Sequence, residues 1–223
     1  MKHILITSLL MILLIVCFIS PHNTLKASAN SSSTAMDCIN IVATPDYLSS
    51  GLLDDALAAI NHARSLEHLR ALHLQANFAT LNAARQQFVL INLERTDRGL
   101  KPLGWDNNLA AMAINYSKQM RDLNFFSHTS PISGSFEKRI GSNPAIAGHF
   151  SVAAENLAGN PVVSAGAVYE YMYDDVAENC GHRNNILNKN LTMVGIGEVD
   201  GGMYGSMSAQ EFLASAPWNP YKG

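Results

Sequence analysis

The clearest hydrophobic pattern in the chain lies between Asp106 and Leu123. Apolar side chains recur there at spacings of three and four, at Leu109, Met112, Ala113, Tyr116 and Met120. Such spacing places the side chains on one face of a helix, and Asp106 is a suitable N-cap. We therefore predict an amphipathic helix that follows Asp106 and ends near Leu123.

Similar spacing predicts three further helices. One begins near Ser50 and continues towards Leu72, and a second begins between Leu81 and Ala84 and stops at Gly99 and Pro102. A third follows Asn160-Pro161, which offers an N-cap and a first-turn proline, and carries Ala165, Val168, Tyr171 and Met172 on one face.

Residues 192–199 and 203–213 have the pattern of strands and flank the turn Asp200-Gly201-Gly202, as in a hairpin. Residues 151–157 can form a short strand or a turn. Helices first and a hairpin last are typical of an α+β fold, with helices packed on a small antiparallel sheet.

The first 29 residues have the pattern of a secretory signal peptide. Lys2 and His3 precede an apolar run of about 16 residues, and Ala27-Ser28-Ala29 offers a cleavage site before Asn30. The run is short for a membrane span, so we predict a secreted protein with no membrane span after cleavage. An uncleaved N-terminal anchor is the alternative.

Cleavage would leave 13 basic and 18 acidic residues, a net charge of −5. Nucleic acids require a concentrated basic face, so this charge argues against them as partners. The remaining cysteines are Cys38 and Cys180, and an even count in an exported protein predicts that they form a disulfide. Two unpaired thiols are the alternative.

Residues able to support chemistry are scattered along the second half of the chain. They are His128, Glu155, Asp174 or Asp175, Glu178 and His182. Two imidazoles with carboxylates suit a divalent metal such as zinc, or an imidazole oriented by an acid. Spacing alone favours independent polar residues, and common catalytic motifs such as Gly-x-Ser-x-Gly or His-Glu-x-x-His do not occur.

Six short motifs, taken in order, resemble the CAP superfamily (cysteine-rich secretory proteins, antigen 5, pathogenesis-related 1), in particular its bacterial secreted branch. The motifs are Asn92-Leu93-Glu94-Arg95, the Trp105 to Tyr116 helix start, Phe126-Ser127-His128, Ala154-Glu155-Asn156-Leu157-Ala158, Gly181-His182-Arg183-Asn184-Asn185-Ile186-Leu187 and Val194-Gly195-Ile196-Gly197. The resemblance implies an α-β-α sandwich. It divides the chain into the signal peptide (1–29), a linker and N-terminal helical extension (30–82), a CAP/SCP domain (83–214) and a C-terminal tail (215–223).

The resemblance also implies a cleft lined by two histidines and two acids. His128, Glu155 and His182 match three of these positions, and Asp174 matches the second acid, with Asp175 and Glu178 in reserve. Asn92, Arg95 and Asn156 match positions with structural roles, Asn156 by fixing the turn after Glu155.

By this resemblance the chain is a secreted binding or interaction module. His128 and His182 would hold zinc or another divalent ion, or the cleft would take a small apolar ligand such as a sterol or lipid. An extracellular or cell-surface protein is the other expected partner. The alternative is a metal- or Glu155-assisted hydrolase acting on ester or peptide bonds, with Glu155 as general base.

Overall fold

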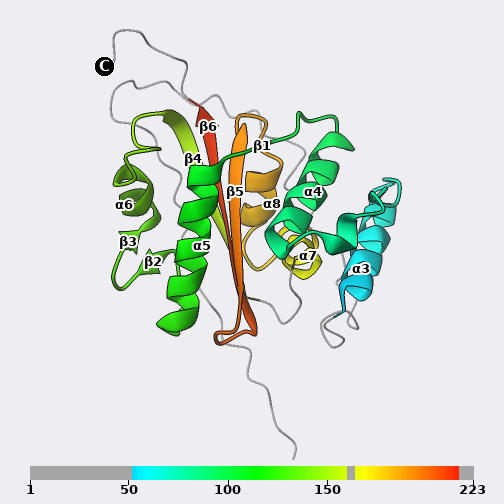
Figure 1. Cartoon of the computed structure of the whole chain (residues 1–223). Helices are drawn as coiled ribbons and strands as arrows, with labels where there is room; N and C mark the ends of the chain where they lie inside the picture. The colour runs from blue at the N-terminus through cyan, green and yellow to red at the C-terminus, as the bar shows by residue number, and fades with distance from the viewer. Residues whose placement is uncertain (1–51, 160–163, 216–223) are drawn as a thin grey trace, which may run out of the picture.

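The fold is built around a four-stranded sheet with helices on both faces (Figure 1). The computed structural model describes residues 52–159 and 164–215. Its elements in chain order are α3 (Leu53–Leu66), η1 (Phe78–Thr80), α4 (Ala83–Thr96), β1 (Gly104–Trp105), α5 (Asn107–Asp122), β2 (Thr129–Ser130), β3 (Gly134–Ser135), α6 (Phe136–Gly141), β4 (Phe150–Gly159), α7 (Ala165–Tyr173), α8 (Gly181–Ile186), β5 (Met193–Asp200) and β6 (Ser206–Ser215).

Helices α5 and α6 cover one face of the sheet, while α4, α7 and α8 cover the other (Figure 1). The strand order is β1-β5-β6-β4, so β4 lies at an edge of the sheet. The predicted α+β sandwich is therefore confirmed. The three long strands pair antiparallel as expected, and the two-residue strand β1 adds a parallel pairing with β5.

The helix predicted after Asp106 is confirmed as α5. The Asp106 side chain accepts hydrogen bonds from the backbone N–H groups of Asn108 and Leu109, at 2.7 and 3.0 Å, which satisfies donors that the first turn leaves free. The predicted helix start at Asn160-Pro161 lies outside the described residues, and α7 begins at Ala165.

Helix α3 ends at Leu66, before the limit near Leu72 that its apolar spacing predicted. Its inner face, at Ala56, Ala59, Ile60 and Ala63, shares one hydrophobic core with α4 and α7. Arg64, whose side chain is fully buried, pairs with Glu94 of α4 at 2.9 Å. This part of the predicted N-terminal extension thus packs into the same core as the rest of the domain.

Asn92 and Arg95 hold α4 to neighbouring backbone, as predicted. Asn92 exchanges two hydrogen bonds with the backbone of Leu103. The Arg95 guanidinium donates to four carbonyl oxygens, those of Lys101, Ile186, Asn188 and Leu191. No acid takes part, and burial lowers the pKa of Arg95.

Gly195 and Gly197 allow α5 to approach β5 closely. A Cβ atom added at Gly195 would lie 2.0 Å from the backbone nitrogen of Ala110. One added at Gly197 would lie 2.1 Å from that of Ile114. Only glycine leaves room for the helix backbone at this distance.

Candidate functional site

Glu155 lies in the middle of β4 and binds His128, which follows the end of α5. One Glu155 oxygen lies 2.6 Å from His128 Nδ1. The acid side chain is 1% exposed and the imidazole 21% exposed. The carboxylate thus fixes the orientation of the ring and leaves Nε2 as the atom available to a ligand.

Arg139 of α6 completes this pair, and the sequence analysis did not identify it. Its guanidinium pairs with the second oxygen of Glu155 and donates to the carbonyl of His128 at 2.9 Å. It also lies over the Tyr116 ring, 3.3 Å from the ring centroid. A single buried cation therefore positions both members of the pair.

Glu211 of β6 is a second residue that sequence reasoning missed. It lies directly opposite Glu155 in the strand register and is fully buried. Neither of its carboxyl oxygens has a hydrogen-bond partner in the described part of the chain. Burial raises the pKa of Glu211 well above its ordinary value, and the nearby charge of Glu155 raises it further. The only sequence signal for Glu211 was its position in a predicted strand, where side chains alternate between the two faces.

The second histidine is paired with Asp175 and not with Asp174, so the first choice for the second acid was wrong. Asp175 Oδ1 lies 2.7 Å from His182 Nδ1, and Asp175 Oδ2 accepts the backbone N–H of Arg183 at 2.9 Å. Asp174 is exposed and Glu178 partly exposed. Because α7 ends at Tyr173, helical spacing no longer applies, and the following turn carries Asp175 inward.

Both histidine pairs are attached to consecutive residues of the edge strand. Glu155 meets His128, and Asn156 donates to the carbonyl of His182 at 3.2 Å. Asn156 also accepts from Asn185 of α8 at 2.9 Å. It lies within β4, so the prediction that it fixes a turn was wrong: it joins the edge strand to α8. Glu155 thus contacts the imidazole of His128, and Asn156 the backbone of His182, from neighbouring positions of β4.

His182 Nε2 is buried and has no hydrogen-bond partner among the described residues. Nδ1 of the same ring, by contrast, is held by Asp175. The ring lies beside Tyr171, with the centroids 5.1 Å apart. A buried nitrogen without a partner is energetically costly unless a ligand or water satisfies it.

The fit to a metal ion is limited. A ligating histidine commonly donates its other N–H to a carboxylate, and both imidazoles have such a carboxylate. Within residues 52–159 and 164–215, however, no group of three or more His, Cys, Asp or Glu side chains is arranged to hold an ion. A closed structural zinc site does not fit this part of the chain, and any ion would need water or ligand atoms to complete its coordination.

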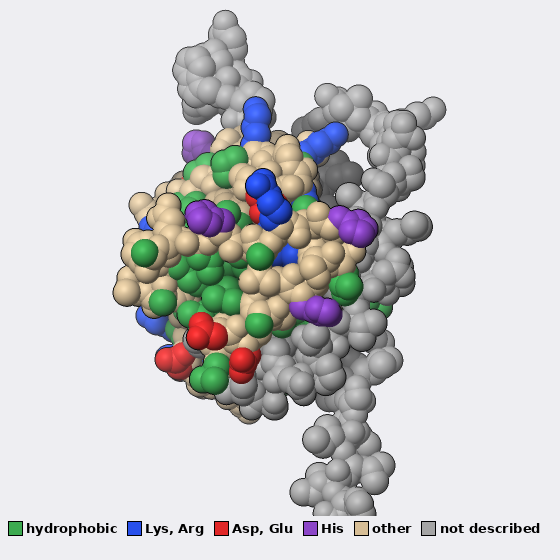
Figure 2. All heavy atoms as spheres, turned by 90° about the vertical axis from the view of Figure 1, so that its right-hand side faces the viewer, with side chains coloured by type: hydrophobic (Ala, Val, Ile, Leu, Met, Phe, Trp, Pro, Cys, Tyr) green, Lys and Arg blue, Asp and Glu red, His purple; other side chains and the backbone are tan. Residues whose placement is uncertain are grey.

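Three further histidines lie on helix α3 or just after it, and His62, His68 and His73 are all exposed. Figure 2 shows histidine side chains spread singly over the face that it draws. Cys180 is buried beside α8, while Cys38 lies outside the described residues, so their disulfide stays a prediction.

Comparison with known proteins gives two relatives from Bacillus subtilis (strain 168). The uncharacterized protein YkwD is 36% identical over 127 residues, which cover 56% of this chain and 44% of that protein. The uncharacterized membrane protein YlbC is 35% identical over 115 residues, which cover 51% of this chain and 30% of that protein. This chain spans less than half the length of either relative.

Solved structures show the same fold. An extracellular protein with an SCP domain from Bacillus anthracis is 32% identical, with a TM-score of 0.50 over 60% of this chain and 40% of that chain. An outer surface protein from Borrelia burgdorferi has a TM-score of 0.52 over 61% of this chain and 96% of that chain, and at 16% identity it supports the fold alone.

The profile described as the cysteine-rich secretory protein family, CAP, matches residues 57–212, which is more than half of the chain. The match includes most of helix α3 and both histidine–acid pairs. With bacterial relatives of similar sequence and fold, this chain belongs to the CAP family.

Proposed function

We propose that this protein is a secreted CAP-family binding module that holds a small ligand at the two imidazoles beside β4. The observation that carries the proposal is His182 Nε2, which is buried and unpartnered while Asp175 fixes the other nitrogen of the ring. With Nδ1–H donated to Asp175, Nε2 presents a lone pair. It can accept a ligand hydroxyl or bind a divalent cation.

The surroundings of His182 suit a ligand with an apolar body and one polar group. Tyr171 beside the ring is fully buried and offers an aromatic wall. A sterol-like molecule has this chemistry, and a divalent ion is the other ligand that a neutral imidazole accepts. This assignment goes beyond family membership, because the relatives named above are uncharacterized or matched over only part of their length.

Glu155 is better placed to orient His128 than to act as a general base. Both of its oxygens are engaged, one by His128 and one by Arg139. A base must lie within reach of the proton that it removes, and the Glu155 side chain is only 1% exposed. The hydrolase alternative therefore gains no support from this geometry, and a panel of ester and peptide substrates tests it.

Secretion rests on the predicted signal peptide and on the extracellular relative from Bacillus anthracis. Residues 1–29 lie outside the described residues. Among the residues that are described, no helix is both long and apolar enough to cross a bilayer.

The test is titration of the purified mature chain with zinc and, separately, displacement of a fluorescent sterol. Whichever probe binds, zinc or sterol, its affinity should fall at least tenfold in His128→Ala and in His182→Ala, because each substitution removes one imidazole. His73→Ala, at an exposed histidine, is the matched control. Binding that survives both histidine substitutions, or wild-type protein that binds neither probe, overturns the proposal.

A second pair of variants tests whether Asp175, and not Asp174, is the acid that holds His182. Asp175→Asn should disturb the His182 tautomer in ¹⁵N ring spectra, because the amide can no longer hold Nδ1–H as a carboxylate does. Asp174→Asn, one residue away and exposed, should leave the same signals unchanged. Equal effects of the two substitutions would remove Asp175 from the site.

A further inference from the structure

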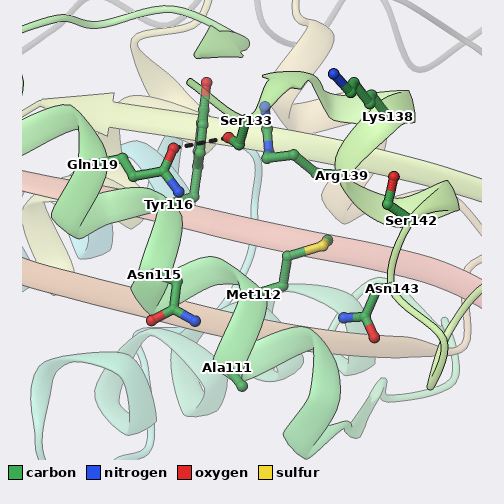
Figure 3. A pocket seen from close by; sticks show the side chains of 10 residues that line it. All are labelled: Ala111, Met112, Asn115, Tyr116, Gln119, Ser133, Lys138, Arg139, Ser142 and Asn143. Carbon is green, nitrogen blue, oxygen red and sulfur yellow. Dashed lines mark hydrogen bonds between the residues drawn. The ribbon is translucent and has the colours of Figure 1, made fainter. Parts of the chain in front are cut away.

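A pocket of about 320 Å³ lies between α5 and α6 (Figure 3). Its lining includes Met112, Asn115 and Gln119 from α5 and Arg139, Ser142 and Asn143 from α6 and the segment after it. The volume lies at the lower end of the range of small-molecule sites. At roughly 30 Å³ per water, it could hold about ten waters or a sugar ring with its substituents.

The lining contains hydrogen-bonding groups that the protein itself leaves unused. The Asn115 amide and the Ser142 hydroxyl make no hydrogen bond within the described chain. The Asn143 side chain accepts from the backbone of Ala145 at 3.1 Å and keeps its NH₂ group free. Several uncommitted donors and acceptors therefore face the same hollow.

Gln119 is held in place by its neighbours. Its Oε1 accepts hydrogen bonds from the hydroxyls of Ser130 and Ser133, both at 2.8 Å, and the second of these bonds is drawn in Figure 3. These two bonds fix the orientation of the Gln119 side-chain amide and leave its Nε2 group as a donor. A preoriented amide loses little freedom when it binds a ligand.

The charges near the pocket do not favour an anionic ligand. No acid lines it, and its two cations are Lys138 and Arg139. The guanidinium of Arg139 is already paired with Glu155. The exposed side chain of Lys138 extends away from Met112 and Asn143 in Figure 3.

A purely apolar ligand also fits poorly. Covering Asn115, Asn143 and Ser142 with a hydrocarbon chain would take their polar groups out of water without replacing the hydrogen bonds, which is costly. Met112, by contrast, offers a thioether against which an apolar surface can pack. The pocket requires a molecule with one apolar face and hydrogen-bonding edges.

We propose that the α5–α6 pocket is a binding site for a neutral saccharide of one or two pyranose rings. The hydroxyls of a pyranose can both donate to and accept from the amides of Asn115, Gln119 and Asn143. The C–H face of the ring packs on Met112. The pocket shares Tyr116 and Arg139 with the surroundings of Glu155 and His128, but the amides proposed to bind the saccharide belong to other residues.

The experiment is a titration of the ¹⁵N-labelled mature chain with cellobiose and with the dimer of N-acetylglucosamine, followed by amide chemical shifts. Shifts confined to α5, α6 and the segment after α6 are expected for at least one of the two sugars. Glucuronate and decanoate serve as the anionic and apolar probes. Preferential binding of either of these in the pocket would overturn the proposal.

Substitutions then assign the contact. Asn115→Leu should weaken saccharide binding by about tenfold, because a sugar hydroxyl would lose its hydrogen-bond partner. Asn108→Leu changes the same residue type at an exposed position of the same helix and should have no effect. His182→Ala should also leave saccharide binding intact, which separates this site from the proposed imidazole site. Absence of binding by both sugars, or equal affinities for the Asn115 and Asn108 variants, refutes the site.

Discussion

The close contact of α5 with β5 gives the sharpest prediction for stability. In Gly197→Ala, the new Cβ would lie 2.1 Å from the nitrogen of Ile114 and 2.4 Å from the carbonyl carbon of Ala113. These are backbone atoms, so no side chain can rotate away. An ordinary contact begins at 3.4 Å, and α5 would therefore have to move away from the sheet by about 1.3 Å.

The movement would loosen a well-packed face. Ala113, Tyr116 and Met120 of α5 are buried against the sheet and would lose contacts. Overpacking usually costs about 1–3 kcal/mol, and a clash with backbone belongs at or above the upper end. We expect Gly197→Ala to lower the free energy of unfolding by about 3 kcal/mol and Tm by roughly 6–12 °C.

Chemical and thermal unfolding followed by circular dichroism measure this loss. Gly141→Ala is the matched control: a Cβ there meets nothing within 4 Å and the position is exposed. It should be neutral or stabilise slightly, since alanine restricts the unfolded chain. If the two alanine variants unfold within about 0.5 kcal/mol of each other, the argument from close packing is refuted.

Three further predictions concern buried polar groups. Arg95→Ala should destabilise by about 3 kcal/mol or more in urea unfolding, because four backbone carbonyls lose their donor; a loss below about 1 kcal/mol would contradict this role. Burial raises the pKa of Glu198 from 4.5 to about 7, so its protonated form stabilises the fold below pH 4.5 and this contribution is lost as the pH rises through 7. Between pH 4.5 and pH 7 the free energy of unfolding of the wild type should therefore fall by up to about 3 kcal/mol relative to that of Glu198→Gln. Parallel stability–pH curves for the two proteins would refute the raised pKa of Glu198. Glu211→Gln should fold normally at neutral pH, as judged by near-UV circular dichroism, because burial and the nearby charge of Glu155 raise the pKa of Glu211 and disfavour its charged form; failure to fold would show that its charge is needed.

The sequence determined the elements well where local rules act alone. The spacing of Leu109, Met112 and Tyr116 indicated helix α5 because the helical period is a property of the backbone, and Asp106 indicated its start through capping. The apolar pattern of α3 predicted its start but not its end at Leu66, because hydrophobic spacing continued beyond the point where the chain turns.

Only part of the candidate site could be predicted from the sequence. His128, Glu155 and His182 were found by resemblance to a family motif, and the structure adds the carboxylate partner of each imidazole. Asp174 and Asp175 could not be distinguished from sequence, since the choice depends on the turn after α7. Their order along the chain carries no information about which one faces inward.

Sequence alone determined the α+β class and the family, because periodicity and motif order are properties that can be read along the chain. Tertiary structure alone decided that Arg139 and Glu211 join Glu155, through contacts between α6, β6 and β4. Such contacts arise from strand register and helix packing between distant segments. No spacing along the chain records them.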